Sequence, residues 1–194
     1  MDKVVSSYLT ALDELNVLTT TSYQMANGDL ATRLKQITDD ILSFLINAYT
    51  HGIEAAATML TAELDVDVNQ MEKAIYQVID GKTFADRIAD HVSVNDLSGL
   101  ITLVESEYHR VYNTAITDGG TDYVNNGSFG VTKNWYTVKD DKVRETHKYL
   151  EGQSIALEEE FFTFDGDHAG YPGGFTKAEN NVGCRCIVRL THDE

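Results

Sequence analysis

The sequence predicts an α+β fold: an N-terminal helical domain, residues 1–120, followed by a small α+β module, residues 121–194. Two observations lead to this prediction. Residues 1–117 contain no proline and repeat apolar residues at helical spacing. Beyond residue 117 lie ten of the fourteen glycines and the only proline and tryptophan, which indicates short elements joined by turns and loops.

The helical domain should contain about five helices, two of them long. They are expected over about residues 3–25, 29–64, 67–80, 84–92 and 93–118. In the second helix apolar residues recur every three or four positions, so one side of the helix is apolar. Such a side either packs within its own bundle, the alternative we favour, or docks a partner.

Residues that commonly cap helices stand at the expected helix starts. Asp29 and the Asp67–Gln70 pair precede the second and third helices. Ser93 with Asp96 resembles a capping box before the last helix. Gly119-Gly120 is expected to stop that helix, because glycine is common just after a helix end.

In the module we expect a short helix and about three antiparallel strands. Residues 130–139 have strand-like content, and Asp140 is expected to cap a helix that runs to about Leu150 and ends at Gly152. Residues 154–164 should form a second strand, and 165–181 a glycine-rich loop. The last strand alternates, with Arg185 and Arg189 on one face and, on the other, Val182, Cys184, Cys186, Val188 and Leu190.

Helical spacing places His147 on the inner face of the short helix, beside apolar neighbours. Cys184 and Cys186 also point inward, so the three side chains could approach one another and hold zinc, with His168 as the fourth ligand. We favour the metal-free alternative, in which the cysteines are small buried hydrophobic residues and His147 is a hydrogen-bonded core histidine. We therefore assign no metal, cofactor or catalytic residue.

Other polar residues have structural interpretations. Arg144 and Asn181 are expected to hold backbone groups of the glycine-rich loop. Asp165-Gly166-Asp167 resembles half a calcium loop, but it lacks the glutamate of an EF-hand and is better explained as an acidic turn. A solvated face, or one with salt bridges between the two parts of the chain, is expected for Glu105, Glu107, His109 and Arg110.

The net charge of -16 argues against broad electrostatic binding to nucleic acid or to an anionic membrane. We expect no signal peptide, because no basic segment followed by an apolar core opens the chain, and no apolar stretch approaches bilayer length. The two cysteines, Cys184 and Cys186, are poorly spaced for a relaxed disulfide, which excludes a secreted disulfide scaffold and favours synthesis in a reducing cytoplasm.

The module carries residues in a distinctive order: Trp135, Asp140, Arg144, His147, Gly152, Asn181, Cys184, Arg185 and Cys186. This order resembles the C-terminal region of the phage Mu protein F-like family, over about residues 105–190. Members typically have Trp, then Asp, then Val-Arg-x-x-His or Cys-x-x-Cys, then Gly, and finally Asn-Cys-Arg-Cys. Here two residues separate Asn181 from Cys184.

The resemblance implies a minor head protein of a tailed phage. It would be a structural protein of the virion head, present in the host cytoplasm during assembly, and would interact with portal or capsid proteins. Some members also influence DNA packaging or delivery, although the net charge here does not favour DNA contact. The motif residues would then stabilise the module.

The alternative is a metal-dependent enzyme or a transferase-like toxin module, since some family members are fused to toxins. The chain ends eight residues after Cys186, so we expect no such extra domain. Glu158-Glu159-Glu160 contains the Glu-x-Glu pattern of ADP-ribosyltransferases, but their upstream arginine and Ser-Thr-Ser strand are not recognisable.

Overall fold

The computed structural model describes residues 3–127, 130–141 and 143–192, and there it has the predicted α+β fold. The helices that precede the first strand are α1 (Lys3–Met25), α2 (Leu30–Leu60), α3 (Val68–Ile75), α4 (Phe84–Val92) and α5 (Leu97–Asn125). The elements that follow are β1 (Val131–Tyr136), α6 (Glu145–Lys148), β2 (Ser154–Ala156), β3 (Phe161–Phe162), β4 (His168–Ala169), α7 (Ala178–Asn181) and β5 (Ile187–His192).

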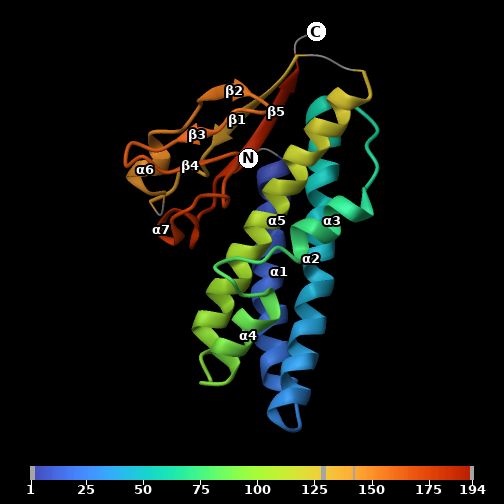
Figure 1. Ribbon diagram of the computed structural model, residues 1–194, viewed down its shortest axis with the longest axis vertical. Helices are drawn as coiled ribbons and strands as arrows, with labels where there is room; N and C mark the ends of the chain where they lie inside the picture. The colour runs from blue at the N-terminus through green and yellow to red at the C-terminus, as the bar shows by residue number, and fades with distance from the viewer. Residues whose placement is uncertain (1–2, 128–129, 142, 193–194) are drawn as a thin grey trace.

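The long helices α1, α2 and α5 run side by side and form a bundle, with α3 and α4 packed against α2 and α5 (Figure 1). The apolar stripe of α2 is buried from Ile37 to Leu60, so this side of the helix packs within its own bundle. Asp29 and Asp67 cap α2 and α3 as predicted, each accepting hydrogen bonds from backbone N–H groups of the first turn.

The module contains an antiparallel sheet of strand order β2-β1-β5 and a β3–β4 pair, among the residues that the structure describes. The sheet lies beside α5, and β5 is the strand nearest the helices (Figure 1). The outer edge of β5 would leave N–H groups unpaired, but two helices cover it. The N–H of Val188 donates to Asn113 Oδ1 of α5 at 2.9 Å, and that of Leu190 points at Met59 Sδ of α2 at 3.2 Å.

Two apolar clusters result. The larger one joins the helices to the sheet, because Val131, Ile187, Val188 and Leu190 pack with the buried residues of the bundle. The smaller one lies inside the module and contains Trp135, Leu150, Phe161, Ala169, Phe175, Cys184 and Cys186. The predicted boundary after residue 120 falls within α5, so the division into two domains stays a prediction.

The prediction that Gly119-Gly120 stops the last helix was wrong, since α5 continues to Asn125. Both glycines are buried at close contacts instead. A Cβ on Gly119 would lie 2.7 Å from the Cβ of Ala56, and one on Gly120 would lie 3.0 Å from a methyl group of Leu190. The missing side chains let α5 approach α2 and the sheet.

Three local predictions also need correction. Asp140 does not cap the short helix: α6 begins at Glu145, and the Asp140 carboxylate accepts a hydrogen bond from Arg185 instead. The N-cap of α5 is Asp96 alone, whose side chain accepts from the N–H of Gly99, whereas Ser93 ends α4. The predicted strand over 154–164 is divided into β2 and β3 by a turn.

The last strand begins at Ile187, so both cysteines lie in the extended segment before it. Within the described parts of the chain, no helix combines the length and apolar character needed to cross a bilayer.

Gly52 is the tightest point between α2 and α5, because a Cβ there would lie 2.5 Å from both the Ala115 Cβ and the Tyr112 carbonyl oxygen. We expect Gly52→Ala to lower the free energy of unfolding by about 1–3 kcal/mol, since two helix backbones would have to separate. Urea denaturation at neutral pH measures this change.

The matched control is Gly120→Ala, whose new methyl group would meet only flexible leucine side-chain ends. Its effect should stay within about 1 kcal/mol of wild type, because the higher helix propensity of alanine offsets the crowding. Equal losses in the two variants would contradict the assignment of Gly52 as the close-packing position.

Candidate functional site

His147 of α6 and the two cysteines before β5 come together in the module, and we call these three residues the cysteine–histidine cluster. Nδ1 of His147 lies 3.4 Å from Sγ of Cys184 and 3.5 Å from Sγ of Cys186. All three side chains are buried, and their ligand atoms lie within 4.8 Å of one another. The cysteines are not joined to each other or to another residue by a disulfide.

Aromatic rings enclose the cluster. The His147 ring lies edge-on to Trp135 and stacked on Phe175, with centroid distances of 5.5 Å in both cases. Trp135 is brought there by β1, and Phe175 by the glycine-rich loop. A small cavity of about 10 Å³ is lined by the three cluster residues together with Val143, Arg144, Gly183 and Arg185.

The two thiols differ in acidity. Burial by itself would raise the pKa of Cys184, but hydrogen bonding with Cys186 and the neighbouring rings of His109 and His147 bring that pKa well below its usual value. The pKa of Cys186 is raised, because the Cys184 sulfur holds its proton and burial disfavours a second charge. The pair therefore gives up one proton readily and keeps the other.

A polar stripe of α5 lies against the module. Nδ1 of His109 is 2.6 Å from the hydroxyl of Tyr8 on α1, while Asn113 donates to the His109 carbonyl at 2.9 Å and accepts from Val188 of β5. The glycine-rich loop crosses the His109 ring at Gly173, where φ is +89° and a Cβ would lie 3.0 Å from Cδ2. Only glycine suits this position, because the backbone conformation and the space both exclude a side chain.

Glu107 and Arg110 are buried, and they are ion-paired within the helices rather than across to the module. Glu107 accepts from Arg87 of α4 at 2.7 Å and from Arg110 at 2.9 Å. Burial raises the pKa of Glu107, but the charges of Arg110 and Arg87 outweigh burial and lower it. Arg110 also donates to the Ala74 carbonyl of α3, so the ion pairs connect three helices.

His109 was expected on a solvated face or on one with salt bridges between the two parts, but it is buried and bonded to Tyr8. Asn113 was not recognised from the sequence as a residue that joins the two parts. Their spacing of four places them on one stripe of α5, the stripe that leads to the close-packed Gly120. That spacing was the available signal.

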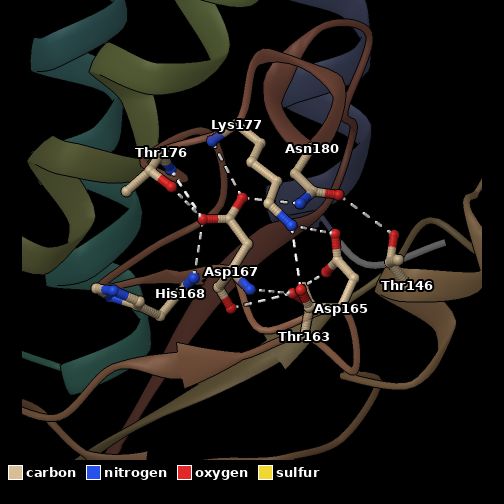
Figure 2. A network of polar contacts seen from close by, with 8 residues as sticks. All are labelled: Thr146, Thr163, Asp165, Asp167, His168, Thr176, Lys177 and Asn180. Carbon is tan, nitrogen blue, oxygen red and sulfur yellow. Dashed lines mark hydrogen bonds and ion pairs between the residues drawn. The ribbon is translucent and has the colours of Figure 1, made fainter.

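A second polar site, centred on Asp167, organises the glycine-rich loop (Figure 2). One carboxylate oxygen of Asp167 accepts from the N–H groups of His168 and Thr176 and from the Thr176 hydroxyl. The other accepts from the N–H of Lys177 and from Asn180 of α7. Burial opposes the charge of Asp167, but these hydrogen bonds dominate and lower its pKa to about 2.

Neighbouring residues extend this network (Figure 2). The Thr163 hydroxyl donates to the Asp167 carbonyl at 3.0 Å, and Lys177 pairs with Asp165 at 2.9 Å. The Asp165-Gly166-Asp167 segment is thus a turn whose carboxylates are occupied by donors of the protein itself. The sequence had not indicated that Asp167 would be its centre.

The residues expected to hold the loop make the following contacts. Asn181 accepts from the Phe175 N–H at 2.9 Å and donates to the Phe175 carbonyl at 2.6 Å. Arg144 donates to the carbonyl of Val182, and Arg185 pairs with Asp140. The bonds of Asn181 and Arg144 satisfy backbone groups that no sheet hydrogen bond satisfies.

The other motif residues and His168 lie as follows. Gly152 has a φ of +76°, and its N–H donates to the Trp135 carbonyl at 2.9 Å, which fixes the turn into β2. His168 lies on β4, away from the cysteine–histidine cluster, and its ring nitrogen is 2.8 Å from a carboxylate oxygen of Glu160. The structure therefore brings together three of the four residues proposed as zinc ligands and separates the fourth.

Comparisons with known proteins show the family. The family described as phage Mu protein F like protein matches residues 68–189, from the first residue of α3 into β5. The chain is also 24% identical over 162 residues to NAD(+)--arginine ADP-ribosyltransferase EFV of Enterococcus faecalis (strain ATCC 700802 / V583). That match covers 82% of this chain and 33% of the relative, so the chain spans about a third of the relative's length. No solved structure matches the chain.

Asp167 should make the free energy of unfolding depend on pH in the acidic range. With a folded-state pKa of about 2 and an ordinary value of 3.8, its charge contributes about 2 kcal/mol above pH 4, and this contribution is lost as the pH falls toward 2. We expect Asp167→Asn to lower the free energy of unfolding at pH 7 by about 2–3 kcal/mol and to remove this part of the pH dependence. Urea denaturation from pH 7 to pH 2 measures both.

Asp141→Asn, at an exposed position before α6, is the control and should change stability by less than about 0.5 kcal/mol. An Asp167→Asn protein as stable as wild type at pH 7 would show that the network does not depend on the charge.

Proposed function

Because the chain belongs to the phage Mu protein F-like family, we propose that it is a structural protein of a tailed-phage head, a minor head component that binds the portal during head assembly. The observation that carries this proposal is the family match, which spans more than half of the chain. It includes α3, α4, α5 and nearly all of the module, so the matched unit contains both the polar stripe of α5 and the cysteine–histidine cluster.

The way the module is held together supports a structural role. Asp167, the most connected carboxylate of the module, is occupied by five donors from the loop and α7. The aromatic rings around the cysteine–histidine cluster pack it to a small cavity of about 10 Å³. Such a module is suited to act as a rigid docking part rather than as a site that opens for substrate.

The surface chemistry supports a protein partner. A net charge of -16 opposes close contact with DNA phosphates. Among its described residues the module exposes three large aromatic side chains: Tyr149, Phe162 and Phe164. Of these, Tyr149 and Phe164 lie 6.2 Å apart as an edge-on pair. Aromatic residues are enriched where protein interfaces bury surface, and we propose that the portal subunit covers this aromatic patch.

Mass spectrometry of purified phage heads, with and without the genome, tests the proposal. We expect the chain at a fixed stoichiometry to the portal subunit in both kinds of particle, because a structural component is retained independently of DNA. Absence of the chain from assembled heads would rule out this function.

The aromatic patch is tested in the same particles. The double change Phe162→Ser with Phe164→Ser should reduce incorporation by about tenfold or more, if each ring contributes as an interface residue of about 1 kcal/mol or above. Val94→Ser changes an equally exposed apolar residue on the helical part and should leave incorporation unchanged. Equal incorporation of all these variants would place the portal contact elsewhere.

The relative from Enterococcus faecalis makes ADP-ribosyl transfer the alternative function to test. In this chain Glu158, Glu159 and Glu160 lie in an exposed turn between β2 and β3, and Glu160 pairs with His168. That turn does not lie beside the enclosed cysteine–histidine cluster, so the two features do not form one active site.

We expect no transfer of labelled ADP-ribose from NAD⁺ to an arginine-containing acceptor by this chain. The Enterococcus faecalis relative provides the positive control, because its name states this activity. Transfer by the wild-type chain that disappears in a folded Glu160→Gln variant would instead establish the enzymatic alternative.

A further inference from the structure

The cysteine–histidine cluster has the dimensions of a metal site. Zinc binds sulfur at about 2.3 Å and imidazole nitrogen at about 2.0–2.1 Å, and its ligands are arranged tetrahedrally. Two such ligands then lie about 3.6 Å apart, which follows from those bond lengths. The observed separations of His147 Nδ1 from the two sulfurs are 3.4 and 3.5 Å. Both nitrogen–sulfur separations therefore match those of a tetrahedral zinc site, and all three donor atoms lie within 4.8 Å of one another.

Without a cation these buried groups have only weak partners. Thiols are poor hydrogen-bond donors and acceptors, and the surroundings of the cluster are the rings of Trp135 and Phe175. Nε2 of His147 makes no hydrogen bond among the residues that the structure describes. Buried polar groups normally find strong partners, so the cluster is poorly explained as a hydrogen-bonded core.

The remaining donor has to come from outside the three residues whose ligand atoms lie within 4.8 Å of one another, and His109 of α5 has the chemistry for it. It is 1% exposed, and its Nε2 has no hydrogen-bond partner within the described ranges. Its other ring nitrogen, Nδ1, lies 2.6 Å from the Tyr8 hydroxyl. A metal-binding histidine typically has one ring nitrogen held by a polar group behind the ring, as the Tyr8 hydroxyl holds Nδ1 here. Asn113, one turn further along α5, donates to the Cys186 carbonyl at 3.4 Å, so this part of the helix borders the cluster.

We propose that one zinc ion binds at the cysteine–histidine cluster, with His109 as the fourth ligand. Binding releases the protons of Cys184 and Cys186 to solvent, so that two thiolates and two neutral imidazoles surround one divalent cation. The ligands come from α5, from α6 and from the segment before β5. The ion thus links the module to the helical bundle, in addition to the bond between Asn113 and β5.

Zinc is the expected metal because of the ligand types. A set of two thiolates and two imidazoles in tetrahedral positions is typical of structural zinc, whereas calcium and magnesium require oxygen ligands. The cavity beside the ligands has a volume of only about 10 Å³, which is too small for a substrate. The proposal is thus independent of any enzymatic activity and of the role in the phage head.

The first experiment measures metal in the full-length chain purified under reducing conditions without chelator. We expect about one zinc ion per chain by elemental analysis. Removal of zinc and titration with Co²⁺ should produce the visible absorption bands of tetrahedral cobalt and a thiolate-to-cobalt charge-transfer band in the near ultraviolet. Chelation should lower Tm by roughly 5 °C or more, because a ligand that binds only the folded state stabilises it.

Variants then assign the ligands. Cys184→Ser, Cys186→Ser and His147→Gln should each lose the zinc, and His109→Gln should weaken zinc binding by at least about tenfold. Tyr8→Phe should weaken binding less, because it removes only the group that holds the His109 ring. His168→Gln changes the exposed histidine bonded to Glu160 and is the matched control that should retain full zinc content.

The proposal would be overturned if the purified wild-type chain contained no zinc and also gave no thiolate–cobalt band on titration. Full zinc content in Cys184→Ser would do the same, and unchanged affinity in His109→Gln would refute the fourth ligand. If a cysteine variant does not fold, as judged by circular dichroism, the thiolate–cobalt band of the wild-type chain decides the question alone.

Discussion

The position of the module against the helices depends on one constraint, the outer edge of β5. A strand at the edge of a sheet presents N–H groups that need partners, and here the partners come from the helices: Asn113 of α5 accepts from Val188, and Met59 of α2 covers Leu190. Because Asn113 also bonds to the His109 carbonyl, the side chain that satisfies the strand is itself fixed to its helix. The sheet therefore lies beside α5 in one defined position.

Close packing makes this contact possible. Gly52 lets α2 approach α5, while Gly119 and Gly120 let α5 approach α2 and the sheet. The cost of glycine within helices, roughly 1 kcal/mol each, is offset by the apolar surface that the approach buries. Val131, Ile187 and Leu190 become part of the same core as the helices. One apolar cluster thus extends across the boundary that the sequence composition suggested.

The module differs from the helices because much of its chain is loop. A long loop has backbone groups that no ladder satisfies, and side chains must satisfy them. Asp167 accepts from three backbone N–H groups, and Asn181 pairs with both backbone groups of Phe175. The loop then places Phe175 on the His147 ring. The order of motif residues in the family is explained by such contacts: Arg144 and Asn181 hold backbone, and Trp135 packs the cluster.

A head component benefits from this construction. In the proposed role at the portal, assembly would repeat the same contact many times, so weak individual contacts would suffice if each copy presented its surface in the same geometry. The exposed rings of Phe162 and Phe164 are carried by β3 and the turn after it, which the Asp167 network adjoins through Thr163. Rigidity of the module and presentation of the aromatic patch are therefore connected.

The sequence by itself determined the secondary structure of the helical part, the α+β class and the family. These depend on local periodicity, on caps such as Asp29 and Asp67, and on the order of motif residues, all of which are properties of neighbouring positions. Tertiary structure decided the rest. Gly119-Gly120 continued a helix because Ala56 and Leu190 lie against them, and Asp140 paired with Arg185 instead of capping α6. His147 contacts the two cysteines, whereas His168 pairs with Glu160, and His109 is buried. Such outcomes depend on residues distant in the chain, whose proximity no local pattern encodes.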